Sequence, residues 1–189
     1  MRRSFLIFFL ILIPFVLTSC NKAGRITDQE LLPENIKLHD NYFTQYVILY
    51  EKGRHRTTNY RKGTMVPVNT QVTLLNVGRK MIEVSLPSGQ RLEIENVQKH
   101  TNDNIYQAFD KLFKKQKVNL ARFTKLERKN INAGSVEKGM SKDAVLVAIG
   151  YPPVTETPTL NMDAWTYWSN RFNRFKVHFH NGRVSQIED

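Results

Sequence analysis

The sequence predicts an α+β protein: a small antiparallel β-barrel, a linking basic helix, and then a unit of short helices on a three-stranded antiparallel sheet. Three observations lead to this prediction. From Tyr42 onward, runs of β-branched and aromatic residues alternate with turn residues, as in proteins built from short strands. From Asn102 the apolar residues recur at helical spacing. The last third of the chain combines a short capped helix with the hairpin signal Asn181-Gly182.

The N-terminus carries a short apolar segment that ends in the only cysteine of the chain. Two arginines are followed by an apolar stretch at 5–17 and by Leu17-Thr18-Ser19-Cys20. This stretch is shorter than the ~20 residues of a membrane-spanning helix, and its layout is that of a secretory signal peptide. An ordinary secretory signal with an incidental cysteine is the simpler alternative.

Leu17-Thr18-Ser19-Cys20 resembles the lipobox of bacterial lipoproteins. The resemblance implies that a signal peptide, residues 1–19, is removed and that Cys20 becomes the lipidated first residue. The two or three acyl chains of such a residue hold a protein stably on a membrane, whereas one chain does not. Because Asn21 follows where an aspartate would signal retention in the inner membrane, the resemblance favours the outer membrane. We therefore expect a lipid-anchored protein that faces the periplasm.

The charge of the chain limits its partners. The full sequence has a formal net charge of +11, and removal of residues 1–19 with their two arginines leaves +9. On an exported protein, such a charge points to anionic lipid head groups, cell-wall polymers or acidic proteins. Nucleic acid does not fit that compartment, and no nucleic-acid recognition motif is present.

The first folded unit is expected at residues 41–100, after a polar tether at 20–40. Within it Ile82, Val84 and Leu86 alternate with polar neighbours, as one buried strand face requires. Its predicted strands are 42–50, 71–77, 80–86 and 91–97, with turns at 76–79 and 87–90.

Residues 63–72 resemble the opening of bacterial Src-homology-3-like barrels, in which a Pro-x-Gly-Thr-x-Val phrase leads into the second strand. Asn69 stands where that phrase has glycine. The resemblance implies a barrel that binds cell-wall peptides or acts as a spacer. The spacer is favoured, because no ligand-contacting set of residues is evident and the fold alone does not specify a function.

A basic helical linker is expected at residues 101–130, with Asn102 or Asp103 as its N-cap. Apolar residues at helical spacing define its inner face: Ile105, Phe109, Leu112 and Phe113, followed by Gln116. Lysines on its other faces are candidate contacts for an anionic surface: Lys111, Lys114, Lys115 and Lys117. Near an anionic membrane each lysine contributes about 1 kcal/mol. A solvated helix that merely joins two units is the favoured alternative.

The segment 139–153 predicts a helix with sharp ends. Ser141 is the expected N-cap, Asp143 places a negative charge in the first turn, and Gly150 ends the helix before two prolines. A helix this short is unstable alone and must dock on other elements. The sheet on which it docks is predicted from the runs 165–169, 175–179 and 184–187.

The order of these elements resembles the SmpA/OmlA (BamE-like) family, the small lipoprotein component of the outer-membrane β-barrel assembly machine. The matching phrases are Gly-Met-Ser-Lys-x-x-Val-x-x-x-x-Gly-x-Pro at 139–152, Trp-x-Tyr at 165–167 and Val-x-Phe-x-x-Gly-x-Val at 177–184. The resemblance implies two helices on a three-stranded sheet over residues 131–189. It also implies envelope or outer-membrane proteins as partners. This chain departs from the family by its barrel and basic helix, which precede the domain.

Trp165 and Tyr167 share one strand face and are expected in the core beneath the helix. Trp168 faces the opposite way, so it is either covered by the barrel or free to contact a partner. Together with the neighbouring loop it forms a candidate contact set of Trp168, Arg171, Phe172 and Arg174. Trp and Arg are enriched in the hot spots of protein interfaces.

No pattern of catalytic or metal-binding residues emerges. His178-x-His180 places two imidazoles on one strand face, but a zinc site needs further ligands, so a solvated face is favoured. Nucleophile-base pairs, paired carboxylates and Gly-rich phosphate loops are not evident. We therefore expect a non-enzymatic protein without a metal or other cofactor. Two functions remain: a protein-interaction or scaffold lipoprotein of the envelope, or a module that binds cell wall or anionic lipid.

Overall fold

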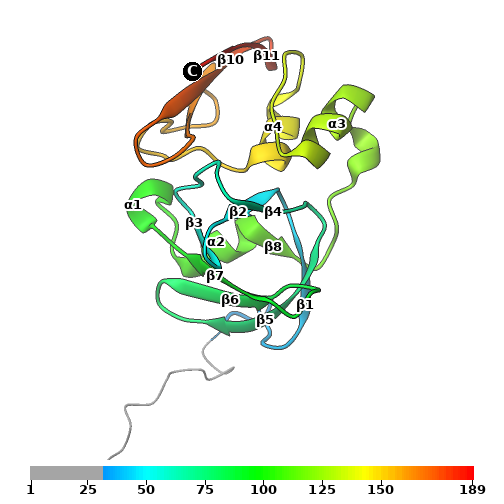
Figure 1. Ribbon diagram of the computed structural model, residues 1–189, viewed down its shortest axis with the longest axis vertical. Helices are drawn as coiled ribbons and strands as arrows, with labels where there is room; N and C mark the ends of the chain where they lie inside the picture. The colour runs from blue at the N-terminus through cyan, green and yellow to red at the C-terminus, as the bar shows by residue number, and fades with distance from the viewer. Residues whose placement is uncertain (1–31) are drawn as a thin grey trace, which may run out of the picture.

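The structure, a computed structural model, describes residues 32–189 and shows an α+β protein in two stacked units. In Figure 1 the lower unit is a curled sheet with helix α2, and the upper unit is a three-stranded sheet with helices α3 and α4. The predicted signal peptide and the lipidation site Cys20 lie outside the described residues. Between residues 32 and 189, no helix is long and apolar enough to cross a membrane.

Six strands form the curled sheet of the lower unit, in the order β3-β7-β6-β5-β1-β8. They are β1 (Asn41–Thr44), β3 (Arg54–Arg56), β5 (Gln71–Val77), β6 (Met81–Ser85), β7 (Arg91–Glu95) and β8 (Phe113–Lys114). Neighbours are antiparallel except for β3 and β7, which are parallel. The predicted antiparallel barrel is in fact an open, half-barrel sheet, because β2 (Ile48–Tyr50) and β4 (Thr64–Val66) pair with each other and do not close it.

The predicted strand 42–50 is two strands, since the chain leaves the sheet after Thr44. The Thr44 hydroxyl donates to the Pro67 carbonyl at 2.8 Å, and the next amide, of Gln45, donates to the Leu112 carbonyl at 2.9 Å. The amide of Val47 then donates to Val147 of the upper unit at 3.2 Å. This bend therefore carries the chain from the lower sheet into contact with the upper unit.

Part of the expected tether belongs to the core of the lower unit. Ile36 is only 1% exposed, and the amide of His39 donates to the Leu74 carbonyl at 2.7 Å. Ile36 packs with the alternate, inward-facing residues of the sheet, such as Val72, Leu74 and Ile82. The folded unit therefore begins before residue 41.

Helix α2 (Ile105–Leu112) is shorter than the expected basic helix and starts at a different cap. Asn104 caps it, in a capping box with Gln107, so the expected cap at Asn102 or Asp103 is wrong. Asn102 instead ends the short helix α1 (Gln98–Thr101) in a left-handed conformation. Helix α2 stops at Leu112 because Phe113 adopts an extended conformation and pairs with Thr44.

The upper unit consists of two helices on a three-stranded antiparallel sheet. After a 3-10 turn, η2 (Leu120–Arg122), its elements are α3 (Lys125–Ala133), α4 (Lys142–Ile149), β9 (Ala164–Trp168), β10 (Arg174–His180) and β11 (Arg183–Glu188). Helix α4 has its N-cap at Ser141 and its C-cap at Gly150, both as predicted. Asn181 and Gly182 form the hairpin turn with φ of 50° and 72°. Helix α3 starts before residue 131, where the sequence placed the domain boundary.

One buried carboxylate joins both helices to the sheet. Glu127 accepts hydrogen bonds from the amides of Thr124 at 2.8 Å and Ser141 at 2.9 Å, which are the N-caps of α3 and α4. Arg183 of β11 lies 3.8 Å from the same carboxylate. Burial opposes ionisation of Glu127, but the hydrogen bonds from these caps outweigh it and lower its pKa to about 2. Glu127 is therefore ionised at neutral pH and holds both helix starts.

Arg61 joins the two units. Its guanidinium donates to the carbonyl oxygens of Val47 at 3.3 Å, Ile149 at 3.2 Å and Gly134 at 3.4 Å. Ile149 and Gly134 end α4 and α3, where the helix dipoles favour a positive charge. Burial lowers the pKa of Arg61 to about 10, so it remains charged at neutral pH. The side chain of Asn59 adds bonds to the carbonyls of Ile149 at 2.7 Å and Tyr151 at 3.0 Å.

His55 makes stability depend on pH. It is 1% exposed, with Nδ1 bonded to the Leu49 carbonyl at 2.8 Å and Nε2 buried without a partner. Burial lowers its pKa from 6.5 to about 4. Between these two values the unfolded chain binds a proton that the folded protein does not, so the free energy of unfolding should fall by about 3 kcal/mol as pH drops from 6.5 to 4. Urea unfolding at a series of pH values measures this fall.

The variant His55→Leu isolates the contribution of His55 from that of the carboxylates. The variant is expected to be less stable at pH 8, because the Leu49 carbonyl loses its donor. Its stability should nevertheless depend less on pH between 6.5 and 4 than that of the wild type. Equal pH dependence in the two proteins would mean that folding does not change the pKa of His55.

Candidate interaction surface

The loop between β9 and β10 presents the most exposed large apolar side chain of the described chain. Phe172 is 80% exposed. The side chain of Asn170 fixes the loop, since its oxygen accepts from the amides of Phe172 at 2.8 Å and Asn173 at 3.0 Å. The amide of Ser169 also donates to the Asn173 carbonyl at 2.9 Å. A short, internally bonded turn therefore holds Phe172 in solvent.

Trp168 lies at the base of this loop but is not free. Its ring packs against Tyr60 and His100, with centroids at 5.8 Å and 5.4 Å, and the guanidinium of Arg174 lies 4.5 Å above it. Its carbonyl accepts a hydrogen bond from the amide of Arg61 at 3.0 Å. The lower unit thus covers part of Trp168, which is one of the two alternatives that the sequence left open. Arg174 also pairs with Glu156 at 3.1 Å, so both Trp168 and Arg174 have partners outside the loop.

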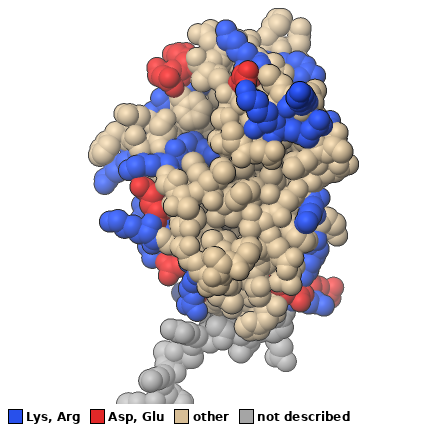
Figure 2. Space-filling view, turned by 45° about the vertical axis from the view of Figure 1, so that its right-hand side comes forward, with Lys and Arg blue, Asp and Glu red and all other residues tan. Residues whose placement is uncertain are grey.

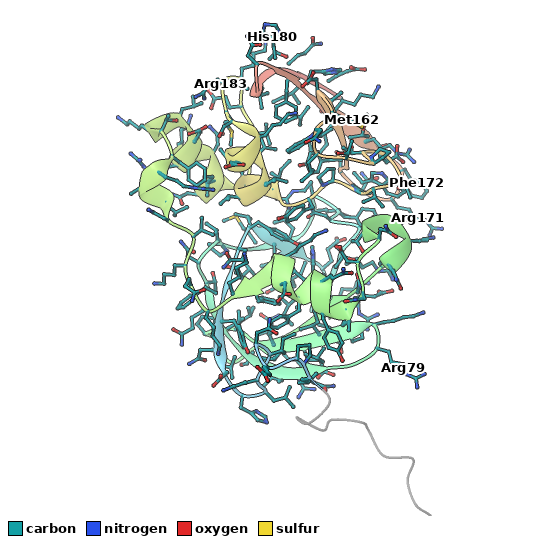
Figure 3. The ribbon with its side chains drawn as sticks, turned by 180° about the vertical axis from the view of Figure 1, so that it is seen from behind. Arg79, Met162, Arg171, Phe172, His180 and Arg183 are labelled. Atoms are coloured by element: carbon teal, nitrogen blue, oxygen red, sulfur yellow. The ribbon has the colours of Figure 1, made fainter. Side chains whose placement is uncertain are left out.

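The other two predicted contacts, Arg171 and Phe172, project from the molecule. Figure 3 shows both at the outer edge, next to α1. The guanidinium of Arg171 lies 5.8 Å from the ring of Phe172. The structure therefore divides the predicted set into two residues that project outward, Arg171 and Phe172, and two that pack on each other, Trp168 and Arg174.

A hollow of about 870 Å³ opens between this loop and the lower unit. Arg171 and Phe172 line one side, and Tyr60, Lys99 and His100 line the other. Two charge pairs on its wall are internal to the lower unit: Arg56 with Glu95 at 2.9 Å, and Lys62 with Glu51 at 3.2 Å. Lys99 and Arg171 make no ion pair with any residue between 32 and 189, so the hollow has an excess of positive charge. Burial and the charge of Lys99 lower the pKa of His100.

We call Arg171, Phe172 and the hollow beside them the loop surface. Sequence reasoning found its outward side but missed Tyr60, Lys99 and His100. These three residues lie next to the loop because the two units pack together, and no pattern in the sequence indicates that packing.

The four lysines predicted to contact an anionic surface do not share one free helical face. Lys111 bonds both oxygens of Asp103, at 2.8 Å and 2.7 Å. Lys115 pairs with Asp40 at 2.8 Å and lies over the ring of Tyr42, and Lys117 lies over the ring of Phe43. Lys111 belongs to α2, which ends at Leu112, whereas Lys115 and Lys117 come after strand β8. Lys114, on β8, is exposed.

A different part of the surface is visibly rich in positive charge. Figure 2 shows Lys and Arg side chains gathered at its upper right, on the side that carries α3. Helix α3 contributes Lys125, Arg128 and Lys129. Lys129 lies 3.8 Å from Glu137, and nearby Arg122 lies 3.6 Å from Asp143.

The two histidines of β10 lie on the outer face of the upper sheet, as the sequence pattern indicated. His178 contacts Glu188 of β11 at 2.9 Å, and His180 is exposed. Within residues 32–189, no three or more His, Cys, Asp or Glu side chains are grouped so that they could hold a metal ion.

The chain matches no family model, no curated protein and no solved structure. The resemblances to lipoproteins, to Src-homology-3-like barrels and to the SmpA/OmlA family therefore remain predictions from the sequence.

Proposed function

We propose that this protein is a non-enzymatic, lipid-anchored lipoprotein of the bacterial outer membrane that binds another envelope protein through the loop surface. The exposure of Phe172 carries the proposal. A partner that covers this ring gains free energy, because apolar surface then leaves water, and a hydrogen-bonded turn next to Trp168 presents the ring. An aromatic anchor beside an arginine has the composition of a binding hot spot.

The resemblance to the SmpA/OmlA family suggests which partner to expect. Two short helices on a three-stranded antiparallel sheet are present, which is the arrangement that the resemblance implies. We therefore propose a subunit of the outer-membrane β-barrel assembly machine as the partner. The unpaired charges of Lys99 and Arg171 favour an acidic rim around an apolar centre on that partner.

Site-specific crosslinking tests this proposal in cells that express the chain with its signal segment intact. A photoreactive phenylalanine analogue is placed at Phe172 and, as a control, at Arg79, which Figure 3 shows on the lower unit, away from the β9–β10 loop. Position 172 should crosslink to a subunit of the assembly machine, and position 79 should not. Equal crosslinking from both positions, or none from position 172, would contradict the proposal.

Variants of the two outward residues, Arg171 and Phe172, test whether the partner depends on them for binding. Arg171→Ser together with Phe172→Ser should reduce recovery of the partner about thirtyfold, as expected for a hot spot of about 2 kcal/mol. The thermal midpoint should stay unchanged, because both side chains are exposed. Trp168 is left intact in this test because it packs between the units. Recovery of wall fragments or anionic lipid in place of protein, lost at high salt, would support the alternative function.

A further inference from the structure

A second cavity lies between α2 and the segment 151–160. Its volume is about 230 Å³. Apolar residues make up most of its wall, among them Ala108, Leu112, Pro152, Val154, Pro158 and Leu160. It is distinct from the loop surface, because no residue of the β9–β10 loop lines it.

The small cavity adjoins a wider groove of about 1100 Å³. Tyr46, Asp103, Lys111 and Tyr151 line both, so these four residues stand at the boundary between an apolar space and a polar one. Four basic and three acidic side chains line the groove, which gives it a small positive excess. A binding site that is mostly apolar and has a few convergent polar groups at its mouth is typical of small-molecule ligands.

The polar groups at this boundary include hydrogen-bond donors that have no acceptor among residues 32–189. Tyr46 is only 5% exposed, and its hydroxyl makes no hydrogen bond to any residue between 32 and 189. Burial raises the pKa of Tyr46 well above its usual value, so its hydroxyl keeps its proton. Lys111 uses two of its three N–H donors on Asp103, and its Nζ lies 5.0 Å from the centre of the Tyr151 ring.

A third donor comes from the segment that faces α2. Thr157 is 2% exposed and lines the small cavity. Its hydroxyl oxygen accepts a bond from the amide of Thr166 at 2.9 Å, and its own proton is donated to no described residue. Asp103, by contrast, has both oxygens bound by Lys111. A ligand that supplies an acceptor would therefore satisfy more of this site than one that supplies a donor.

We infer that this cavity binds a small amphiphilic carboxylate. Its apolar chain or ring fills the space beside Ala108, and its carboxylate lies at the mouth, where Tyr46 and Lys111 donate to it. The groove beyond the mouth accommodates any part of the ligand that exceeds the small cavity. A hydrogen bond from the Tyr46 hydroxyl contributes to affinity, because its proton is donated to no residue between 32 and 189.

Calorimetric titration of the purified protein with octanoate tests the inference directly. Octan-1-ol and octylammonium, which share the chain but not the carboxylate, are the comparison ligands. Octanoate should bind at least tenfold more tightly than either, and the thermal midpoint should rise with the logarithm of its concentration once that concentration exceeds the dissociation constant. No heat with millimolar octanoate, or tighter binding of octylammonium, would overturn the inference.

Three variants locate the site. Ala108→Leu fills the cavity and should abolish octanoate binding. Tyr46→Phe should weaken binding about tenfold, which corresponds to one lost hydrogen bond, while the free protein unfolds at an equal or higher temperature. Tyr106→Phe is the control: it removes a phenol hydroxyl from α2, the helix that carries Ala108, but Tyr106 does not line the cavity. This variant should bind octanoate as the wild type does. Unchanged binding in both Ala108→Leu and Tyr46→Phe would rule out this cavity.

Discussion

Gly150→Ala is expected to lower the free energy of unfolding by about 3–5 kcal/mol, the sum of a backbone and a packing cost. Gly150 has φ 76° and ψ −163°, a conformation that residues with a Cβ rarely adopt. A Cβ there would lie 2.7 Å from two ring carbons of Tyr46 and 2.9 Å from the amide nitrogen of Asn59. Urea denaturation followed by circular dichroism measures the loss.

Gly89→Ala separates the two costs in this prediction. Gly89 also has a positive φ, of 80°, but a Cβ there would meet nothing within 4 Å. It should therefore show the backbone cost alone, about 1 kcal/mol. If the two variants were equally stable, the close approach of Gly150 to Tyr46 would not exist in solution.

Arg61→Met is expected to cost about 3 kcal/mol or more, because three carbonyl oxygens lose a charged donor in a partly buried site. It should also uncouple the two units. Trp165 and Trp168 are the only tryptophans in the chain and both belong to β9, so their fluorescence reports the upper unit. In the variant the fluorescence transition in urea should precede the transition seen by circular dichroism, whereas in the wild type the two should coincide.

Lys62→Met is the matched control for this variant. Lys62 is the next residue in the chain, but it is exposed, and its one ion pair within residues 32–189 is with exposed Glu51 at 3.2 Å. Such surface pairs contribute about 0–1 kcal/mol, so the two transitions of Lys62→Met should still coincide. Coincident transitions in Arg61→Met as well would show that other contacts carry the coupling.

Local signals in the sequence predicted the regular elements well. Strand β5 has the predicted bounds, Gln71–Val77, and α4 has both predicted caps. These elements combine a clear apolar period with turn or cap residues at their ends, so local preference and tertiary packing agree. The three-stranded sheet of the upper unit was predicted for the same reason.

The elements that the sequence analysis missed depend on distant contacts. Strand β3 is Arg-His-Arg, which no strand pattern indicates. It pairs in parallel with β7 and buries His55, while Arg54 and Arg56 lie beside Glu93 and Glu95. Helix α3 has few apolar residues, although its capping box, Thr124 with Glu127, was a readable signal. The loop surface combines residues from both units, so only its outward half was predictable.

The described chain starts at the lower end of Figure 1 and finishes at the upper end, so the length of the lower unit separates residue 32 from the upper sheet. With a lipid on Cys20, as we propose, the intervening residues would reach at most about 40 Å. The lower unit would then act as a stalk, and the loop surface would contact its partner at a distance from the bilayer surface. We therefore expect the loop surface to engage a water-exposed domain of the partner, and not its membrane-embedded part.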